Sequence, residues 1–490
     1  MSNKTQKISV LEKVGYSLGD FSANLIFQTL MTFLAYFYTD VYKIPANAAS
    51  AIIFAGGMVG AFSTPIMGII ADRTNTRWGK FRPWILWTSI PFGVFSILAF
   101  STPGFGPTGK IIYALCTYIL LVLIYAANNL PYSSLSGVLT GDMKERNSIS
   151  SYRFVAVTLA QFIVQSVLLP LVLILGDGDK AAGFEKVMLA FAIVGTIFFI
   201  ITFLTTKERI LPPKEQKTSV KQDLLDLTKN KPWIMILIAT VFIFITLALK
   251  GGIYIYYFEN YVDNVALAAF LTNIGFNDFI NGLNNMLIGM GMSGFEWPED
   301  AASSAFSLFN ASGIIMMIIA IAISKPLADK YGKRALFLFA ITLAAAAQAS
   351  FFFVGKENVA AVFILQIVHG FFYGLTIPLL WAMVADVADY SEWKNNRRAT
   401  AIVFSAMLFG LKAGLAIGGS LVAGILSLYN YNPELAVQSD KAIQGVLMCM
   451  SIYPGLTFLV SIIALFFYEI DKKTEVMLEK ELSARRANNQ

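Results

Sequence analysis

Long apolar runs alternate with short polar segments along almost the whole of this 490-residue chain. Each run is long enough to cross the apolar core of a bilayer as a helix. Backbone groups in lipid must be hydrogen-bonded internally, so the pattern predicts an all-α membrane protein with twelve transmembrane helices. The runs fall at about 15–38, 46–71, 83–101, 111–137, 150–176, 184–206, 232–257, 304–325, 335–355, 359–385, 399–428 and 442–469.

A polar stretch at 207–231 separates the first six runs from the last six. We therefore expect an N-terminal six-helix bundle at 1–206, a central link, a C-terminal six-helix bundle at 232–469 and a tail at 470–490. Within the second half, the segment 258–303 is acidic and contains no Lys or Arg. Its apolar stretches are too short and too polar to span, so we expect a partly helical cap on the outer side. A simple insertion tolerated in a loop is the alternative.

Positive charge is distributed unevenly among the connections. Lys and Arg gather in the N-terminal arm, the connections after the even-numbered runs, the central link and the tail. By the positive-inside rule, both termini and the central link should be cytoplasmic, in a multi-pass protein of the cell inner (plasma) membrane. The other connections hold only Lys43, Lys110, Lys180, Lys186, Lys356 and Lys441.

The composition narrows the class of protein further. The chain is 56% hydrophobic and 14% charged, and its net charge of +6 belongs to one side of the membrane, so it does not indicate a nucleic-acid partner. Its 2 cysteines and single histidine form no metal-ligand pattern. We find no phosphate-cradling glycine loop and no nucleophile–histidine pairing. An enzyme is therefore not expected, and neither is a cofactor or a bound metal.

The stretch Thr64–Trp84, TPIMGIIADRTNTRWGKFRPW, runs from apolar sequence through a short basic loop and back into apolar sequence. A weaker copy, SKPLADKYGKR, lies at Ser324–Arg334. Both copies place a proline before an acid–base pair and a Gly-Lys after it. The repeat indicates two related halves, so we expect the two bundles to be pseudo-symmetric.

Several motifs resemble those of the glycoside–pentoside–hexuronide symporters of the major facilitator superfamily, the branch typified by melibiose permease. They occur in the order of that family over almost the whole chain. They are GYSLGDF at Gly15–Phe21, YFYTDVY at Tyr36–Tyr42, PIMG with RWGKFRPWIL at Pro65–Leu86, NNLPYSSL at Asn128–Leu135, RF at Arg153–Phe154, WAMVADVADYSEW at Trp381–Trp393 and LFGLKAG around Lys412.

The resemblance implies a major facilitator fold whose two bundles rock about a central sugar site, with flux coupled to Na⁺, H⁺ or Li⁺. The expected partners are a small sugar or glycoside, the lipid bilayer and, if transport is coupled, H⁺. We expect the protein to be monomeric.

Charges within the apolar runs are costly in lipid, which makes them candidates for function. Lys412 lies near the middle of the eleventh run, and Arg153 and Asp20 lie near the starts of the fifth and first. In the family, Lys412 would lie near the cation and sugar sites and Arg153 at the sugar site. Pairing of Lys412 with a carbonyl or carboxylate, and helix-end roles for Arg153 and Asp20, are the alternatives. We expect Lys250 to snorkel toward the outer interface.

Polar side chains at helical spacing form stripes that suit sugar hydroxyls, because amides and hydroxyls both donate and accept hydrogen bonds. His369 has Gln366 and Tyr373 on its face, and Trp381 could stack on a pyranose ring. Hydrogen bonding between helices, or packing for Trp381, is the alternative. The further members of the stripes are Tyr125, Asn128, Asn129, Gln161 and Gln165.

The chain departs from its family where carboxylates would be expected. Sodium-coupled members have two acids in the second run, where this chain has Gly60 and Thr64, and the family's sugar-binding aspartate falls on Asn129. The acid of the first run falls on Asn24 or on Asp20, depending on which motif is aligned. Because a buried Na⁺ needs oxygen ligands and negative charge, we expect no Na⁺ binding at this place.

The two copies of the loop motif are expected to form the cytoplasmic gate. Ion pairs that break in every cycle should be individually weak. The gating candidates are Asp72, Arg73, Arg77, Lys80, Asp142, Arg146, Asp329, Lys330 and Arg334.

Three forms of sugar transport remain open at this stage. The substrate could be a hexuronide paired with Arg153 or Lys412, transport could be coupled to protons through Asp20, His369 or Lys412, or a neutral glycoside could move without coupling. A non-transporting sensor and a lipid transporter on the same fold are the alternatives from other classes.

Overall fold

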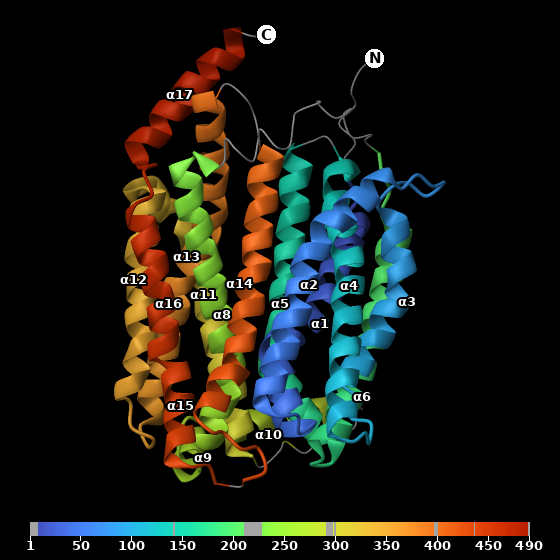
Figure 1. The fold of residues 1–490 in the computed structure, drawn as a ribbon, viewed down its shortest axis with the longest axis vertical. Helices are drawn as coiled ribbons and strands as arrows, with labels where there is room; N and C mark the ends of the chain where they lie inside the picture. Colours follow the sequence, from blue (N-terminus) through green and yellow to red (C-terminus); the bar gives the residue numbers. More distant parts are fainter. Residues whose placement is uncertain are drawn as a thin grey trace.

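The computed structural model describes residues 8–140, 143–209, 228–290, 297, 300–395, 400–435 and 437–488. Long helices run nearly side by side, and α1 begins at the same end of the bundle at which α17 ends (Figure 1). We call this the terminal end. The opposite end, where α9 and α10 lie, we call the α10 end.

The first half of the chain forms six long helices with one short π-helical extension. The elements are α1 (Val10–Tyr36), η1 (Phe37–Val41), α2 (Ala46–Arg73), α3 (Arg82–Ala99), α4 (Pro107–Leu139), α5 (Met143–Gly176) and α6 (Lys180–Thr205). Residues 210–227 of the expected central link lie outside the described residues.

The second half has more elements, because short helices interrupt the series of long ones. They are α8 (Lys231–Asn260), α9 (Asn264–Asn273), α10 (Phe276–Gly289), α11 (Ala301–Tyr331), α12 (Lys333–Ser350), η2 (Phe351–Phe353), α13 (Val359–Asn395), α14 (Thr400–Leu428), α15 (Asp440–Met450), α16 (Ile452–Phe466) and α17 (Lys472–Asn488).

Short polar side chains mark where many of these helices begin. The first backbone N–H groups of a helix have no partner within it, and a side-chain oxygen at the preceding position accepts from one of them. Asp179, for example, accepts from Ala181 N at 2.9 Å at the start of α6. The other side chains that cap helices in this way are Ser9, Asn230, Asp263, Asp300 and Ser439.

Ten helical segments within the described residues are long and apolar enough to cross a membrane. They correspond to α2, α4, α5, α6, α8, α11, α12, α13, α14 and the pair α15–α16. Large apolar side chains such as Ile90, Val155 and Leu204 are more than half exposed. Such a surface suits contact with lipid tails.

The last apolar run, expected as one helix over 442–469, consists of two helices. The chain breaks from helical geometry at Ser451 (φ −120°, ψ −75°), and Pro454 follows in the first turn of α16. Proline is tolerated there, since its missing N–H would be unpaired in any first turn.

Helix contacts are made mainly within each half, and a few pairs, among them α1–α14, join the halves. The pair α2–α14 and the pair α5–α11 make most of these contacts, together with α1 against α8. On α14, Gly414 and Gly418 let α8 approach so closely that a Cβ at Gly418 would lie 2.3 Å from the carbonyl oxygen of Ile245. Small residues four apart are the usual means of close helix packing in membranes.

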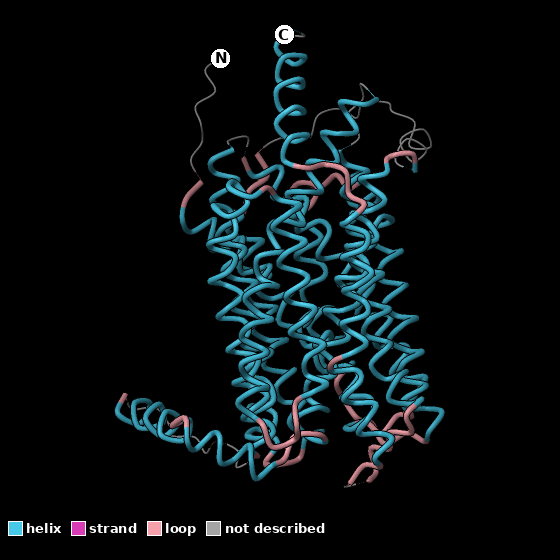
Figure 2. Tube along the Cα trace, turned by 90° about the vertical axis from the view of Figure 1, so that its left-hand side faces the viewer, coloured by secondary structure: helices cyan, strands magenta, loops and turns pink. Residues whose placement is uncertain are grey.

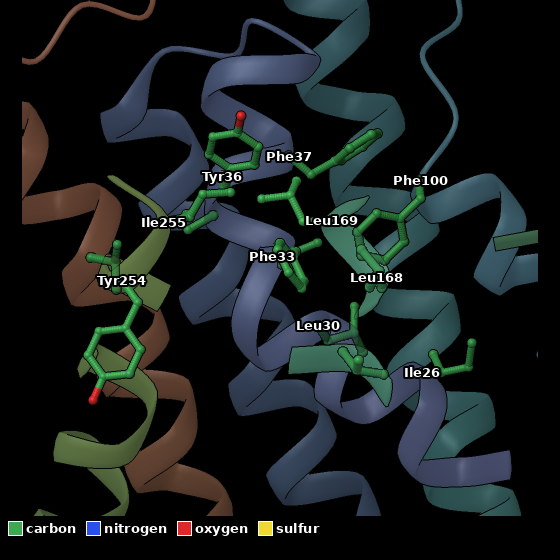
Figure 3. Close-up of a cluster of buried hydrophobic side chains, with 14 of the residues drawn as sticks. Ile26, Leu30, Phe33, Tyr36, Phe37, Phe100, Leu168, Leu169, Tyr254 and Ile255 are labelled. Carbon is green, nitrogen blue, oxygen red and sulfur yellow. The ribbon is translucent and has the colours of Figure 1, made fainter. Parts of the chain in front are cut away.

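Aromatic and aliphatic side chains fill the junction of α1, α5 and α8. Phe33 and Phe37 of α1 and η1 are fully buried, and Phe37 lies 4.9 Å from Phe100 between ring centroids. Leu168 and Leu169 of α5 lie beside them, whereas the ring of Tyr254 turns away from this cluster (Figure 3).

The acidic segment 258–303 contains α9 and α10, which lie at the α10 end (Figures 1 and 2). Neither helix is long enough to count among the membrane-crossing segments of the described chain. Leu267 and Leu271 of α9 are buried, and Phe270 stacks on Phe363 of α13 at 4.8 Å. Of this segment, residues 291–296, 298 and 299 lie outside the described residues.

Candidate functional site

A cavity of about 350 Å³ lies between helices of the two halves. Such a volume falls at the lower end of the range of small-ligand sites. The first half contributes amides and hydroxyls from α1 and α5, and none of the described residues that line the cavity is Asp or Glu. The polar lining from the first half is Gln28, Thr32, Thr158, Gln161 and Gln165, and from the second half Lys250, Tyr254, Asn310, Gln366, His369, Tyr373 and Thr376.

Lys250 of α8 and His369 of α13 form a hydrogen-bonded pair at this cavity. The other ring nitrogen, His369 Nδ1, lies 3.0 Å from the carbonyl oxygen of Ala344. A carbonyl oxygen only accepts, so Nδ1 carries a proton and Nε2 offers its lone pair to the ammonium of Lys250. The pair therefore combines a neutral imidazole with one positive charge.

The expectation that Lys250 snorkels to the outer interface is wrong. Its residue exposure is only 7%, and its Nζ lies 5.6 Å and 5.5 Å from the ring centroids of Tyr254 and Tyr373. Packing of α13 against α8 covers the lysine and offers it hydrogen-bonding and cation–π partners inside the bundle. The spacing of Lys250 and Tyr254, four residues apart on α8, was the available signal of a polar face.

The opposite wall of the cavity carries side chains with spare hydrogen-bonding capacity. Gln165 Nε2 donates to Gln28 Oε1 at a long 3.4 Å. The hydroxyl of Thr32 is buried and has no hydrogen-bond partner within the described part of the chain. Unpaired buried hydroxyls are costly, so a ligand hydroxyl at this place would be stabilising. Gln161 and Trp381, both predicted from the sequence, also line this cavity.

Lys412 lies beside a second, much smaller cavity of about 70 Å³. Its Nζ donates to Thr64 Oγ1 at 2.5 Å and lies 5.9 Å from the ring centroid of Tyr125. Gly60 lines the same cavity. The sequence predicted no Na⁺ binding at Gly60 and Thr64. In the structure, the ammonium group of Lys412 lies at this place.

Arg153 and Asp20 form an ion pair at 2.5 Å between Nε and Oδ2. The guanidinium carbon lies 5.4 Å from the ring centroid of Tyr132, which stacks on Tyr16 at 4.6 Å. The two tyrosines also donate their hydroxyls to each other's carbonyl oxygens, at 2.9 Å and 2.7 Å. Neither charge lines the larger cavity, and each neutralises the other.

The three asparagines predicted as sugar ligands line neither of these two cavities. Asn128 is buried and donates from Nδ2 to Thr88 Oγ1 at 2.8 Å, which joins α4 to α3. Asn24 donates to the carbonyl oxygen of Asp20 within α1 at 2.9 Å, and Asn129 is half-buried. In the structure, Asn128 therefore makes a hydrogen bond between two helices.

The basic loop after α2 is organised by a carboxylate that the sequence did not single out. Glu208 accepts from the backbone N–H groups of Lys80, Phe81 and Arg82 at 2.9, 2.8 and 2.9 Å, where α3 begins. An anion at a helix N-terminus is favourable. Gly79 makes the approach possible, because its φ is +109° and a Cβ there would lie 2.4 Å from the Glu208 carboxyl carbon.

The other gating candidates lie at the terminal end. Arg73 and Arg77 are exposed. Lys472 donates to the carbonyl oxygens of Asp329 and Lys330, and Arg334 to that of Phe466. The side chains of Asp72 and Arg146, and the whole of Asp142, lie outside the described residues, so the expected contact of the loop with Asp142–Arg146 stays a prediction.

Polar contacts between the halves are found at the α10 end. Glu259 Oε1, at the end of α8, accepts from Lys180 Nζ and from the hydroxyl of Tyr36, both at 2.7 Å. Lys180 and Tyr36 belong to the first half. Nothing in the sequence indicated this cluster, because its three members lie far apart in the chain and no spacing relates them.

Asp40 forms a second link at that end. Tyr431 of the other half donates to Asp40 Oδ1 at 2.7 Å, and Thr39 donates to Oδ2 at 2.6 Å. Burial raises the pKa of Asp40 to about 6, against the lowering effect of these hydrogen bonds and of Lys43, and Glu259 raises it further.

Among the described residues, no group of three or more His, Cys, Asp or Glu side chains could hold a metal ion. The two cysteines are unpaired, Cys116 exposed and Cys449 buried.

Comparison with known proteins places these features among membrane transporters. The model of the family described as "MFS/sugar transport protein" matches residues 15–283 and 300–472. The inner membrane symporter YicJ of Escherichia coli (strain K12) is 33% identical over 468 residues, which cover 95% of this chain and 93% of that protein. An isoprimeverose transporter of Lactiplantibacillus pentosus is 33% identical over 471 residues, covering 95% and 90%.

Among solved structures, a proton-dependent oligopeptide transporter aligns with a TM-score of 0.63 at 12% identity. The alignment covers 96% of this chain and 100% of that chain. At this identity the likeness extends to the fold alone.

Proposed function

We propose that this chain, which belongs to the MFS/sugar transport protein family, moves a glycoside, oligosaccharide or sugar acid across the membrane by alternating access. The family and its curated relatives make the chain a secondary sugar transporter of the glycoside–pentoside–hexuronide branch rather than an enzyme. The observation that carries the proposal is the cavity of about 350 Å³, whose walls come from both halves of the chain. Motion of one half against the other would expose it to either side in turn.

The proposed architecture has twelve membrane helices in two six-helix bundles. Ten segments are long and apolar enough to cross a membrane. We add α1 and α3 as the remaining two membrane helices. α1 has 27 residues and α3 has 18, which suffices for the apolar core. The Lys and Arg that gather at the terminal end support a cytoplasmic location for this end, in a protein of the inner membrane. Because one chain supplies both walls of the cavity, the proposed unit is a monomer.

The proposed conformation is closed toward the outside. Polar contacts join the halves at the α10 end, through Glu259 and Asp40, and at mid-depth, where Lys412 meets Thr64. A rocking motion that opens the outer side has to break the links of Glu259 and Asp40. The loops after α2 and α11 then close the cytoplasmic side in the opposite state.

Transport is proposed to be coupled to protons or uncoupled, and not coupled to Na⁺. At the place where sodium-coupled members are expected to have acids, Thr64 Oγ1 accepts from Lys412 Nζ at 2.5 Å, and Gly60 lines the same small cavity as Lys412. A second cation beside it would meet repulsion without a compensating carboxylate, which is unfavourable in a buried site.

Counterflow in proteoliposomes tests these proposals. A panel of radiolabelled neutral glycosides and uronides is offered with and without Na⁺ and with and without a pH gradient. We expect exchange of at least one sugar, with rates that do not respond to Na⁺. Sodium-dependent uptake that is abolished by Thr64→Ala would contradict the coupling proposal, and absence of exchange for every sugar would contradict the function.

A further inference from the structure

We propose that the Lys250–His369 pair is an anion-binding subsite, which takes the carboxylate or sulfonate group of an acidic sugar. This inference rests on the proposed function and specifies the chemical class of its substrate. It assigns the recognition of negative charge to α8 and α13, and not to Arg153 or Lys412.

The pair carries one positive charge that lacks a counter-ion. Lys250 makes no ion pair within the described chain, and the lining of the cavity contains no described Asp or Glu. His369 is 1% exposed and held by the carbonyl oxygen of Ala344, so its lone pair orients one N–H of the ammonium. The other two N–H groups remain for a ligand. A buried ammonium group is costly unless an anion accompanies it.

The two other intramembrane cations are less suitable. Arg153 already has Asp20 as a counter-ion at 2.5 Å, so this pair is neutral overall. Lys412 lines a cavity of about 70 Å³, well below the volume of typical small-ligand sites. Of these three cations, Lys250 is the one that combines burial, an unbalanced charge and a place on the wall of the 350 Å³ cavity.

The two walls of the cavity also suggest how such a sugar is oriented. The wall from α1 and α5 carries amides and hydroxyls, including Gln161 and the unpaired hydroxyl of Thr32. These groups match the uncharged hydroxyls of a sugar ring. The acidic group of the substrate therefore points to α8 and α13, and the ring hydroxyls point to α1 and α5.

The test compares sugars that differ only in charge. Uptake is measured in proteoliposomes for methyl glucuronide against methyl glucoside, and for methyl galacturonide against methyl galactoside. The quantity compared is the ratio of kcat/KM for the acidic and the neutral member of each pair. Removal of a charge-assisted hydrogen bond predicts that Lys250→Met lowers this ratio by about ten- to a hundredfold.

Gln161→Ala provides the matched control, because it alters the opposite wall. It should lower transport of both members of a pair and leave their ratio unchanged. Lys250→Arg keeps the charge and should restore part of the preference for the acidic sugar. A ratio that Lys250→Met does not change, or a preference of the unmodified protein for the neutral member, would overturn the subsite while the transport function stands.

A chemical variant of the substrate keeps the test decisive if Lys250→Met fails to fold. In the unmodified protein, the methyl ester of methyl glucuronide should be transported about ten- to a hundredfold less well than the free acid. Equal transport of ester and acid overturns the subsite. If no sugar of either charge is transported, the proposed function fails together with this inference.

Discussion

Replacing Glu259 by Gln should open the outer side of the protein. In the closed form, Oε1 of this residue accepts from Lys180 and from Tyr36, each at 2.7 Å, across the boundary between the halves. Charge-assisted hydrogen bonds contribute about 1.5–3 kcal/mol when buried, and exposed ion pairs about 0.2–1 kcal/mol. The side chains of Lys180 and Glu259 are 35% and 20% exposed, which places this cluster between those limits.

Glu259→Gln keeps an acceptor oxygen but removes the charge, so we expect a loss of about 1–2 kcal/mol from the closed form. The ratio of outward-open to closed molecules should then rise by about five- to thirtyfold. A cysteine introduced at Thr32 in a Cys116→Ser background reports this ratio, because Thr32 lines the central cavity. The rate at which a membrane-impermeant maleimide labels it in intact cells follows the open fraction.

Glu357→Gln serves as the control, because Glu357 is an exposed acid at the same end of the molecule. It should leave the labelling rate unchanged. If the Glu259→Gln variant is labelled no faster than this control, the cluster of Glu259, Lys180 and Tyr36 does not hold the outer side closed. The free energy assigned to its hydrogen bonds is then refuted.

Three further predictions concern buried polar groups. Asn128→Ala should lower the free energy of unfolding by about 1 kcal/mol without raising the KM for a sugar, because it removes the hydrogen bond to Thr88. A raised KM with unchanged stability would contradict this role in helix packing. Arg153→Ala leaves Asp20 buried without a partner and should lower the free energy of unfolding by about 3–5 kcal/mol, as measured by thermal unfolding. The double variant Asp20→Asn/Arg153→Gln should lower it by less. Equal losses would argue against the ion pair. Because the pKa of Asp40 is raised to about 6 in the folded form, its contribution to stability is present in acid and is lost as pH rises through 6. The free energy of unfolding should be about 1 kcal/mol larger at pH 5 than at pH 7 because of this group, and Asp40→Asn should abolish that part of the difference.

The two copies of the loop motif have similar sequences but different local contacts. After α2, the backbone N–H groups at the start of α3 are bound by Glu208 from beyond α6. After α11, Lys333 pairs with Asp386 of α13 at 2.5 Å and lies 3.7 Å from Glu475 of α17. The first half therefore uses a carboxylate on the loop backbone, and the second half uses an ion pair between helices. The repeat in the sequence predicted that the two loops lie at equivalent positions in the two halves. It could not predict that Glu208 binds the first loop, or that Lys333 of the second pairs with Asp386.

Much of the fold could be predicted because burial in lipid has simple requirements. An apolar run of about twenty residues has to be helical to satisfy its backbone hydrogen bonds, whatever it packs against. The run at 111–137, for example, lies within α4 (Pro107–Leu139). The break at Ser451 could not be foreseen, since apolar composition continues on both sides of it.

The site was predicted only in part, because hydropathy does not determine which face of a helix meets which neighbour. His369, Gln161 and Trp381 were expected at a cavity and do line it. Lys250 was expected at the outer interface, yet α13 covers it, since His369 lies opposite it on the packed face.

By itself, the sequence of this protein determined which segments are apolar, in which connections positive charge gathers, and which family motifs are present. These properties follow from residue type and local order. Only the tertiary structure decided that Arg153 is neutralised by Asp20, that Lys412 meets Thr64, and that Lys250 stands without a described counter-ion at the central cavity. Pairing of charges depends on distances of a few ångströms between residues far apart in the chain, and such distances are set when the helices pack.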